Sequence, residues 1–235
     1  MTTVSTCIAD NVAEVRGRIA DAAISVNRDP SSVTLIAASK MQDSRAVQAA
    51  IQAGVDACGE NKVQELVAKH AEGAYALKPS HFIGHLQRNK VSKVVGLAAL
   101  IQSIGSSELA SEVSERALKL GIVQDVLLEV NIGGEASKSG YAVDGFEDSL
   151  ESALTLRGIR VRGLMCIPPV VEVGRANSEY FDRMAKIFVD NQHKMLHNGD
   201  VTYLSMGMSG DFEDAIRHGA NMVRVGRAIF GSRYG

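Results

Sequence analysis

Val33-Thr34-Leu35-Ile36-Ala37-Ala38-Ser39-Lys40 is an apolar run that ends on a lysine, and it predicts a buried strand whose last side chain is an amine. A helix-like segment follows at 44–53, and the same order of strand and helix recurs along the chain. Most of these strands are apolar without strict alternation, which is typical of parallel strands that helices cover. The other expected strands are 55–59, 81–84, 100–104, 124–132, 159–167, 201–206 and 222–225.

This alternation predicts a (β/α)8 barrel, the TIM barrel of the α/β class, because eight units in roughly 200 residues approach the usual size of that fold. Ile8, Val12, Val15 and Ile19 have helical spacing, so a helix should precede the first strand. An open doubly wound sheet is the competing architecture, but no GxGxxG turn follows the first strand. No low-complexity linker divides the chain, and we expect residues 1–235 to form one domain.

The composition excludes several classes of protein. The 235 residues carry a formal net charge of −2 and no strongly basic run, so neither a nucleic acid nor a membrane is expected as a partner. Cys7, Cys58 and Cys166 are scattered and odd in number, which argues against a disulfide framework or a structural zinc site. The sequence shows no leader-like segment and no run of membrane-spanning length. We therefore expect a soluble, cytoplasmic protein.

Lys40 is the first candidate functional residue. The carboxyl ends of barrel strands emerge on one face, and that face carries the active site. A lysine at the end of a strand is most simply a solvated residue. Its other interpretation is a Schiff-base lysine, whose amine loses its proton and attacks an aldehyde.

Two glycine-containing segments near the C-terminus predict a phosphate site. Ser209 stands between Gly207 and Gly210 after the seventh strand, and Gly226 follows the eighth. In many barrels these two loops bind phosphate together with a short extra helix, here expected at 227–230. A serine hydroxyl and free backbone amides would bind a phosphate dianion. These residues could equally be ordinary turn residues, but an amine beside a phosphate cradle is what pyridoxal phosphate (PLP) requires.

Other polar residues at the expected strand ends have two interpretations each. Asn61 is either a ligand contact or the N-cap of the following helix, with Gln64 at its third position. His81 is more simply a hydrogen-bonded structural residue than a catalyst. Arg224 lies within the eighth strand, where a charge needs a partner.

Three methionines stand near the ends of strands six and seven, at positions 165, 206 and 208. They fill the core, or they form an apolar wall beside a flat aromatic cofactor.

The chain resembles the pyridoxal phosphate homeostasis proteins, a PLP-binding family related to the N-terminal barrel of alanine racemase. The resemblance rests on motifs that occur in family order from residue 33 to the end, and the ordered set is far more specific than any one motif. Lys62 departs from the pattern, because an aromatic residue is expected there more often. The motifs are ASK at 38–40, GEN and VQE within 59–65, HFIG and LQRNK within 81–90, SKSG at 137–140, GLM at 163–165, LSMGMS at 204–209, and VRVG and IFG within 223–231.

This resemblance implies a fold-type III barrel that holds PLP as a Schiff base on Lys40. Arg224 would face the pyridine nitrogen and keep it unprotonated, because an arginine does not readily give up a proton. Ser209 and the backbone amides of Gly226 and Arg227 would bind the phosphate. The complete set of implied cofactor contacts is Lys40, Asn61, Met206, Ser209, Arg224, Gly226 and Arg227.

The function that the resemblance implies is a PLP carrier that maintains vitamin B6 and amino-acid balance without turnover of its own. PLP-dependent apoenzymes are the partners that such a role implies. Because no second domain shares the site, a monomer is expected. Lys138, a second lysine in a family-like run, is interpreted as a solvated loop residue rather than a transient PLP contact.

Two enzymatic alternatives stay open. An amino-acid racemase needs acid and base groups on both faces of the substrate Cα, and alanine racemase takes one of them, a tyrosine, from a second domain. Tyr203 and Tyr234 are the tyrosines that this chain offers near its end. A phosphosugar-type barrel enzyme would use the phosphate cradle without PLP, and Glu129 is a candidate acid or base for it, although a buried, paired carboxylate is the simpler interpretation.

Overall fold

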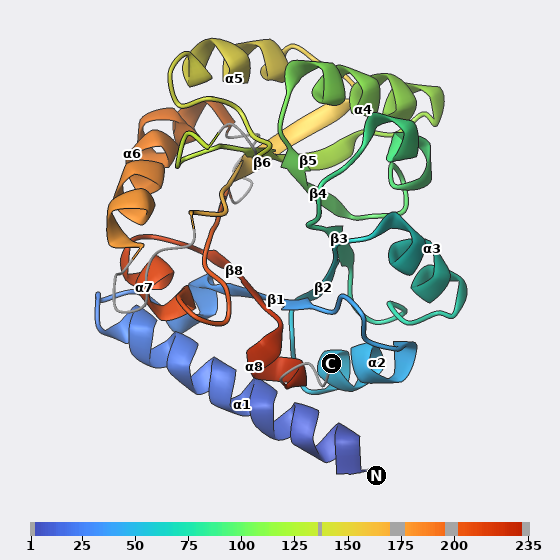
Figure 1. Cartoon of the computed structure of the whole chain (residues 1–235), viewed down its shortest axis with the longest axis vertical. Helices are drawn as coiled ribbons and strands as arrows, with labels where there is room; N and C mark the ends of the chain where they lie inside the picture. Colours follow the sequence, from blue (N-terminus) through green and yellow to red (C-terminus); the bar gives the residue numbers. More distant parts are fainter. Residues whose placement is uncertain (1–2, 136–137, 170–176, 196–201, 232–235) are drawn as a thin grey trace.

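A computed structural model describes residues 3–135, 138–169, 177–195 and 202–231. In these ranges eight parallel strands close into a barrel in sequence order, and helices surround it (Figure 1). The eighth strand pairs with the first, which excludes an open sheet and confirms the predicted TIM barrel.

Each strand expected from the sequence is present, usually one to three residues shorter at an end. The first strand ends two residues before Lys40, so this lysine stands in the loop that leaves the barrel. The strands are β1 (Thr34–Ala38), β2 (Ala57–Glu60), β3 (Ser80–Phe82), β4 (Leu100–Ile104), β5 (Gln124–Glu129), β6 (Ile159–Met165), β7 (Tyr203–Ser205) and β8 (Met222–Val225).

The helices agree with the sequence except in one segment. The alternation of strands and helices predicts a helix at about 89–99, between the third and fourth strands, but the structure has a short 3-10 helix followed by turns there. Gly96, with a φ of 82°, lies in these turns and prevents the helix from continuing toward the fourth strand. The helices are α1 (Thr3–Ile24), α2 (Ser44–Gln52), α3 (Val63–Ala71), α4 (Ser107–Lys119), α5 (Phe146–Leu154), α6 (Ser178–Met195), α7 (Phe212–Arg217) and α8 (Arg227–Phe230), with the 3-10 helices η1 (Pro30–Ser32) and η2 (Arg88–Lys93).

Local sequence signals explain where helices begin. The carboxylate of Asp43 accepts a hydrogen bond from the backbone N–H of Ala46 at 2.8 Å and caps α2. The hydroxyl of Ser106 accepts from the N–H of Leu109 at 3.2 Å and caps α4. Both helices therefore start at the residue that the sequence indicates.

The core has two parts, because successive strand residues point to opposite faces. Leu35 and Ala37 pack in the outer cluster, between the barrel and the helices, whereas Ile36 packs inside the barrel. Lys40 shares the inward parity of Ile36. The inner cluster takes one residue from each of six strands: Ile36, Ala57, Leu100, Leu127, Met165 and Met222.

The helix α1, expected to precede the barrel, crosses the outside of α7, α8 and α2 (Figure 1). Val12, Val15 and Ile19 are buried on its inner face. The side chain of Arg28, just after α1, donates to the carbonyl oxygens of Ile216 and Ala220 at 2.9 Å each, which fastens this end to the α7 region. None of the helices that the structure describes is long and apolar enough to cross a membrane.

The amino ends of the strands carry an ionic cluster. Asp125 accepts two hydrogen bonds from Arg160, at 2.7 and 3.0 Å, and one from Arg162, at 3.0 Å. The guanidinium of Arg162 lies 5.7 Å from the ring centre of Tyr203, which itself packs against the inner cluster. This cluster lies at the end of the barrel opposite the candidate site.

Candidate functional site

The ends of β1, β2 and β8 meet at the carboxyl face of the barrel. Ala38 is in register with Gly59 of β2, and Ala37 is in register with Val225 of β8. Lys40 comes two residues after Ala38, and Asn61 comes two residues after Gly59. The two residues are therefore side by side where the chain leaves the barrel. Gly226 directly follows β8, and a Cβ there would lie 3.1 Å from the carbonyl oxygen of Ala38. The glycine therefore permits a close approach of the two strand ends.

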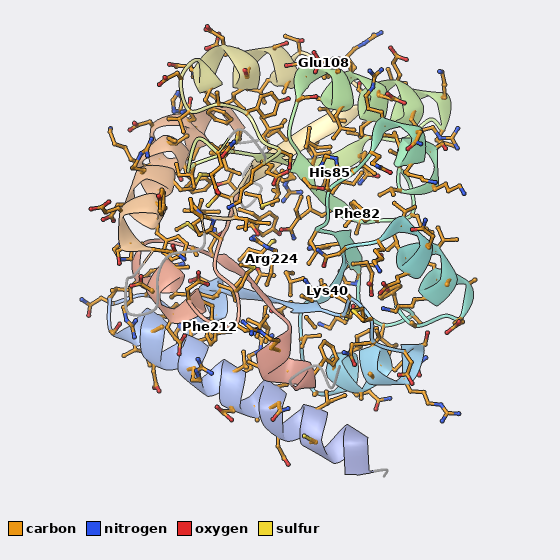
Figure 2. All side chains as sticks on the ribbon, viewed as in Figure 1. Lys40, Phe82, His85, Glu108, Phe212 and Arg224 are labelled. Atoms are coloured by element: carbon orange, nitrogen blue, oxygen red, sulfur yellow. The ribbon has the colours of Figure 1, made fainter. Side chains whose placement is uncertain are left out.

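Lys40 has a partly buried side chain. Among the described residues it has no hydrogen-bond or ion-pair partner. Figure 2 shows Lys40 and Arg224 within the ring of helices, whereas Glu108 lies out on its rim. The amine is thus placed at the mouth without a counterion to occupy it.

The loops after β7 and β8 gather hydrogen-bond donors. The hydroxyl oxygen of Ser209 accepts from the backbone N–H of Gly226 at 3.1 Å and from that of Ala228 at 3.4 Å. Because the oxygen accepts both bonds, its own O–H proton is left to donate. Arg227, the first residue of α8, is exposed. The phosphate cradle stays a prediction: these polar groups gather one strand away from Lys40, with the two backbone amides directed at the Ser209 oxygen.

Arg224 is buried within β8 and its guanidinium donates to neutral acceptors. Nη1 donates to the hydroxyl oxygen of Ser205 at 2.5 Å, and Nη2 donates to the carbonyl oxygen of Cys166 at 2.9 Å. Ser205 donates to Oε1 of Gln102 at 2.7 Å, and Nε2 of Gln102 lies 3.0 Å from Nδ1 of His81. A guanidinium can only donate, so the direction of each bond in this chain is set and Nδ1 of His81 is the final acceptor.

Burial controls the charges in this region. It lowers the pKa of the Arg224 guanidinium, which still keeps its proton at neutral pH. It lowers the pKa of His81 to about 4, so this imidazole is neutral. Burial also raises the pKa of Glu129, while a hydrogen bond from Ser139 at 3.1 Å and the charge of Arg224 oppose the rise. Among the described carboxylates none is within ion-pair distance of Arg224, and the hydrogen bonds of its guanidinium go to neutral oxygens.

A second buried cluster lies behind the mouth, between β2 and α3. The carboxylate of Glu60 is fully buried, and its Oε1 accepts from the Ser39 hydroxyl at 2.6 Å, from the Lys69 amine at 2.7 Å and from the Tyr75 hydroxyl at 2.9 Å. Its Oε2 has no partner among the described residues. Burial, and to a smaller extent the negative charge of Glu60, raises the pKa of the neighbouring Cys58 thiol to about 12. This cysteine is therefore not a nucleophile.

The three methionines near strands six and seven do not form a wall. Met165 belongs to the inner cluster, Met206 is buried in the outer cluster, and Met208 is exposed. Met206 points away from the barrel interior because it follows the inward-facing Ser205 by one residue. The Met206 side chain thus packs in the core, and the contact of this residue with a cofactor stays a prediction.

Several other sequence interpretations change with the structure. The N-cap of α3 is Lys62, not Asn61, so the capping interpretation of Asn61 is wrong and its partly buried side chain stands at the mouth. Tyr203 begins β7 at the opposite end of the barrel and cannot serve as an acid at the mouth. Lys138 is not simply solvated, because it pairs with Glu135 and donates to the carbonyl oxygen of Pro168 at 3.3 Å. Tyr234 and Ser137 lie outside the described residues.

Sequence reasoning missed two sets of supporting residues. Gln102 and Ser103 are polar residues within the apolar run 100–104, a signal that could have marked Gln102 as a buried hydrogen-bonding residue. Lys69 gave no such signal, because a lysine within a helix usually faces solvent. Its burial becomes visible only when α3 packs against β2.

Comparisons with known proteins agree with this fold. The family model for the N-terminal domain of alanine racemase matches residues 8–234. The pyridoxal phosphate homeostasis protein of Aquifex aeolicus is 38% identical over 228 residues, covering 95% of this chain and 97% of the relative. The structure of PipY from Synechococcus elongatus with PLP bound is 32% identical, with a TM-score of 0.80 over 95% of this chain and 100% of that one.

A more distant likeness concerns the fold alone. Alanine racemase of Clostridium difficile is 16% identical with a TM-score of 0.72. The match covers 96% of this chain but 58% of the racemase.

Proposed function

This chain belongs to the pyridoxal phosphate homeostasis proteins, a family with the barrel of the alanine racemase N-terminal domain, and we propose that it binds PLP at the carboxyl mouth of that barrel. In this proposal the protein holds PLP as a Schiff base on Lys40. It acts in the intracellular balance of PLP and amino acids, and it has no turnover reaction of its own.

One observation carries the proposal: an amine with no counterion among the described residues and a group of polar atoms suited to a phosphate stand at the ends of adjacent strands. Lys40 follows β1, and the donors of Ser209, Gly226 and Ala228 lie beside the end of β8. When bound, PLP supplies an aldehyde that condenses with amines and a ring that withdraws electrons. The residues present fit both ends of such a molecule.

The other site residues fit between these two ends. Ser209 and the backbone amides of Gly226 and Arg227 would bind the phosphate. Arg224 keeps its proton and would donate to the pyridine nitrogen, so that nitrogen stays unprotonated and the ring withdraws electrons weakly. Asn61 would contact the ring beside Lys40.

The racemase alternative finds no acid at the mouth in Tyr203, and its other candidate, Tyr234, lies outside the described residues. Racemisation needs an acid or base on each face of the substrate Cα. Lys40 would supply one, but Tyr203 lies at the opposite end of the barrel. Exchange of the α-hydrogen of an amino acid in deuterated water, catalysed by the PLP-loaded protein, would favour the racemase over the carrier.

The proposed contacts come from β1, β2, β7 and β8 and the loops after them, all within one barrel. We therefore propose that residues 1–235 work as one domain and as a monomer, with PLP-dependent apoenzymes as recipients of the cofactor.

The test is a visible absorbance spectrum of the protein with PLP, followed by borohydride reduction and peptide mass mapping. We expect a yellow band and a label on Lys40. Lys40→Ala should lose both, whereas Lys186→Ala, which removes an exposed lysine of α6, should retain both. A band that persists in Lys40→Ala, or a label spread over surface lysines, would overturn the proposal and favour the phosphosugar-type barrel.

A further inference from the structure

The two peptide groups on either side of the Lys40 Cα are both held by side chains of the helix α3. The carbonyl oxygen of Ser39 accepts from the amine of Lys69 at 2.8 Å. The N–H of Met41 donates to Oε2 of Glu65 at 2.6 Å. Glu65 and Lys69 are four residues apart, so they stand on one face of α3. One helix face therefore determines how the backbone runs into and out of Lys40.

The Lys69 contact is itself fixed by the buried cluster. Lys69 is 5% exposed and forms an ion pair with Glu60 at 2.7 Å, and the hydroxyl of Ser39 donates to the same carboxylate. Ser39 is thus held twice, through its carbonyl group and through its side chain. These groups lie outside the barrel wall, on the side of β2 that faces α3, so they are not placed to contact a cofactor at the mouth.

The Glu65 contact stabilises an unusual turn. Met41 has a φ of 64°, in the left-handed region that residues other than glycine rarely adopt. Its side chain is 67% exposed, while the preceding Lys40 remains partly buried. The turn sends the two neighbouring side chains in different directions, and the hydrogen bond to Glu65 keeps it in place.

We propose that Glu65 and Lys69 are positioning residues that aim the Lys40 amine into the mouth, ready to attack the aldehyde of PLP. This inference rests on the proposed function. In the step concerned, the amine nitrogen forms a C=N double bond to the aldehyde carbon, and the aldehyde oxygen leaves as water. A lysine whose backbone is fixed before PLP arrives reacts faster, because fewer orientations must be excluded at the moment of attack.

Glu65→Ala is the sharpest variant, because the Glu65 side chain is 22% exposed. It removes the ion pair of Glu65 with Lys69 at 3.6 Å, but Lys69 keeps its pair with Glu60 at 2.7 Å. We expect the rate at which the yellow band forms to fall about tenfold, the effect of one charge-assisted hydrogen bond. Glu65→Gln keeps an oxygen that can accept from Met41 and should restore most of the rate. Val67→Ala, an exposed change on the same helix, should react like the parent protein.

A PLP analogue separates positioning from loss of the site. In 4′-deoxypyridoxine 5′-phosphate a methyl group replaces the aldehyde, so its binding does not need the Lys40 amine. We expect Glu65→Ala to bind this analogue as tightly as the parent protein does. Equal losses for PLP and the analogue would mean that the whole site had been disturbed, and the positioning role would be wrong.

A double variant tests the other contact. Lys69→Met alone would leave the Glu60 carboxylate buried without its cation, so it is combined with Glu60→Gln. This pair should also slow the reaction with PLP and leave analogue binding unchanged. A wild-type rate in both Glu65→Ala and the double variant would overturn the inference. Failure of the parent protein to be labelled on Lys40 would instead overturn the proposed function.

Discussion

At the scale of single residues, His81 ends a line of hydrogen bonds that begins at Arg224. The Arg224 guanidinium can only donate, and it donates to the Ser205 hydroxyl, which in turn donates to Gln102. The side-chain N–H of Gln102 then donates to His81, which accepts. A protonated His81 would have no acceptor to offer Gln102. The neutral imidazole is therefore part of what holds Arg224 in place.

This arrangement predicts a loss of stability in acid. The pKa of His81 is about 4 in the folded protein and near 6.5 in the unfolded chain, so the unfolded state binds a proton first as the pH falls. The contribution of neutral His81 to the free energy of unfolding is fully present above pH 6.5. It is lost between pH 6.5 and 4, by about 3 kcal/mol at most. Urea unfolding at several pH values measures it.

The control for this prediction is His81→Asn, whose side-chain oxygen can still accept from Gln102 but does not titrate. Its free energy of unfolding should fall less steeply between pH 6.5 and 4. Parallel pH profiles for the two proteins would show that His81 is not the group responsible.

The residues of the site divide into those that a sequence can reveal and those that it cannot. Lys40, Ser209 and Gly226 were found because they follow apolar strands, and the carboxyl ends of barrel strands meet. The face that the Met206 side chain occupies could not be read from the sequence, because a shift of one residue at a strand end reverses that face. Lys69 was missed because its partners, Ser39 and Glu60, come from other strands and nothing in the helix itself indicates them.

At the scale of elements, the strands were the most predictable part. Most are apolar runs bounded by turn residues, and β4 and β8 have the bounds that the sequence indicates. Capping residues located some helix starts, as Ser106 does for α4, but not that of α3, whose N-cap is Lys62 rather than Asn61. The segment 89–99 failed because its composition favours a helix, whereas Gly96 turns the chain toward β4.

The helix α1 provides a test of what an added element contributes. Ile19 is 1% exposed in the layer between α1 and the barrel, and Ile24, at the end of the same helix, is 61% exposed. We expect Ile19→Ala to lower the free energy of unfolding by about 2–5 kcal/mol, because it leaves a cavity. Ile24→Ala should change it by less than about 0.5 kcal/mol. Equal effects in chemical unfolding would mean that α1 is not packed as described.

At the scale of the whole molecule, the proposed cofactor should stabilise the fold. The site joins the ends of β1 and β8, the two strands whose pairing closes the barrel. A ligand that binds only the folded protein adds about 2.7 kcal/mol when its free concentration is 100 times its Kd. For a chain of this size that corresponds to a rise in Tm of roughly 5–10 °C.

Thermal unfolding with and without PLP measures this linkage. Lys40→Ala should show a smaller rise at the same PLP concentration, because only the phosphate and ring contacts remain. An unchanged Tm in the parent protein at saturating PLP would contradict a site at the mouth.

The ionic cluster of Asp125, Arg160 and Arg162 has a consequence for how a ligand enters and leaves the barrel. The inner cluster fills the barrel between this ionic cluster and the candidate site. A ligand of the candidate site is therefore expected to reach it from the carboxyl mouth. Binding and release of the ligand would then use the same opening and could not occur at the same time. In the proposed carrier role, a recipient enzyme bound over the mouth would prevent a new PLP from binding until it dissociated. Each encounter would then transfer a single PLP molecule.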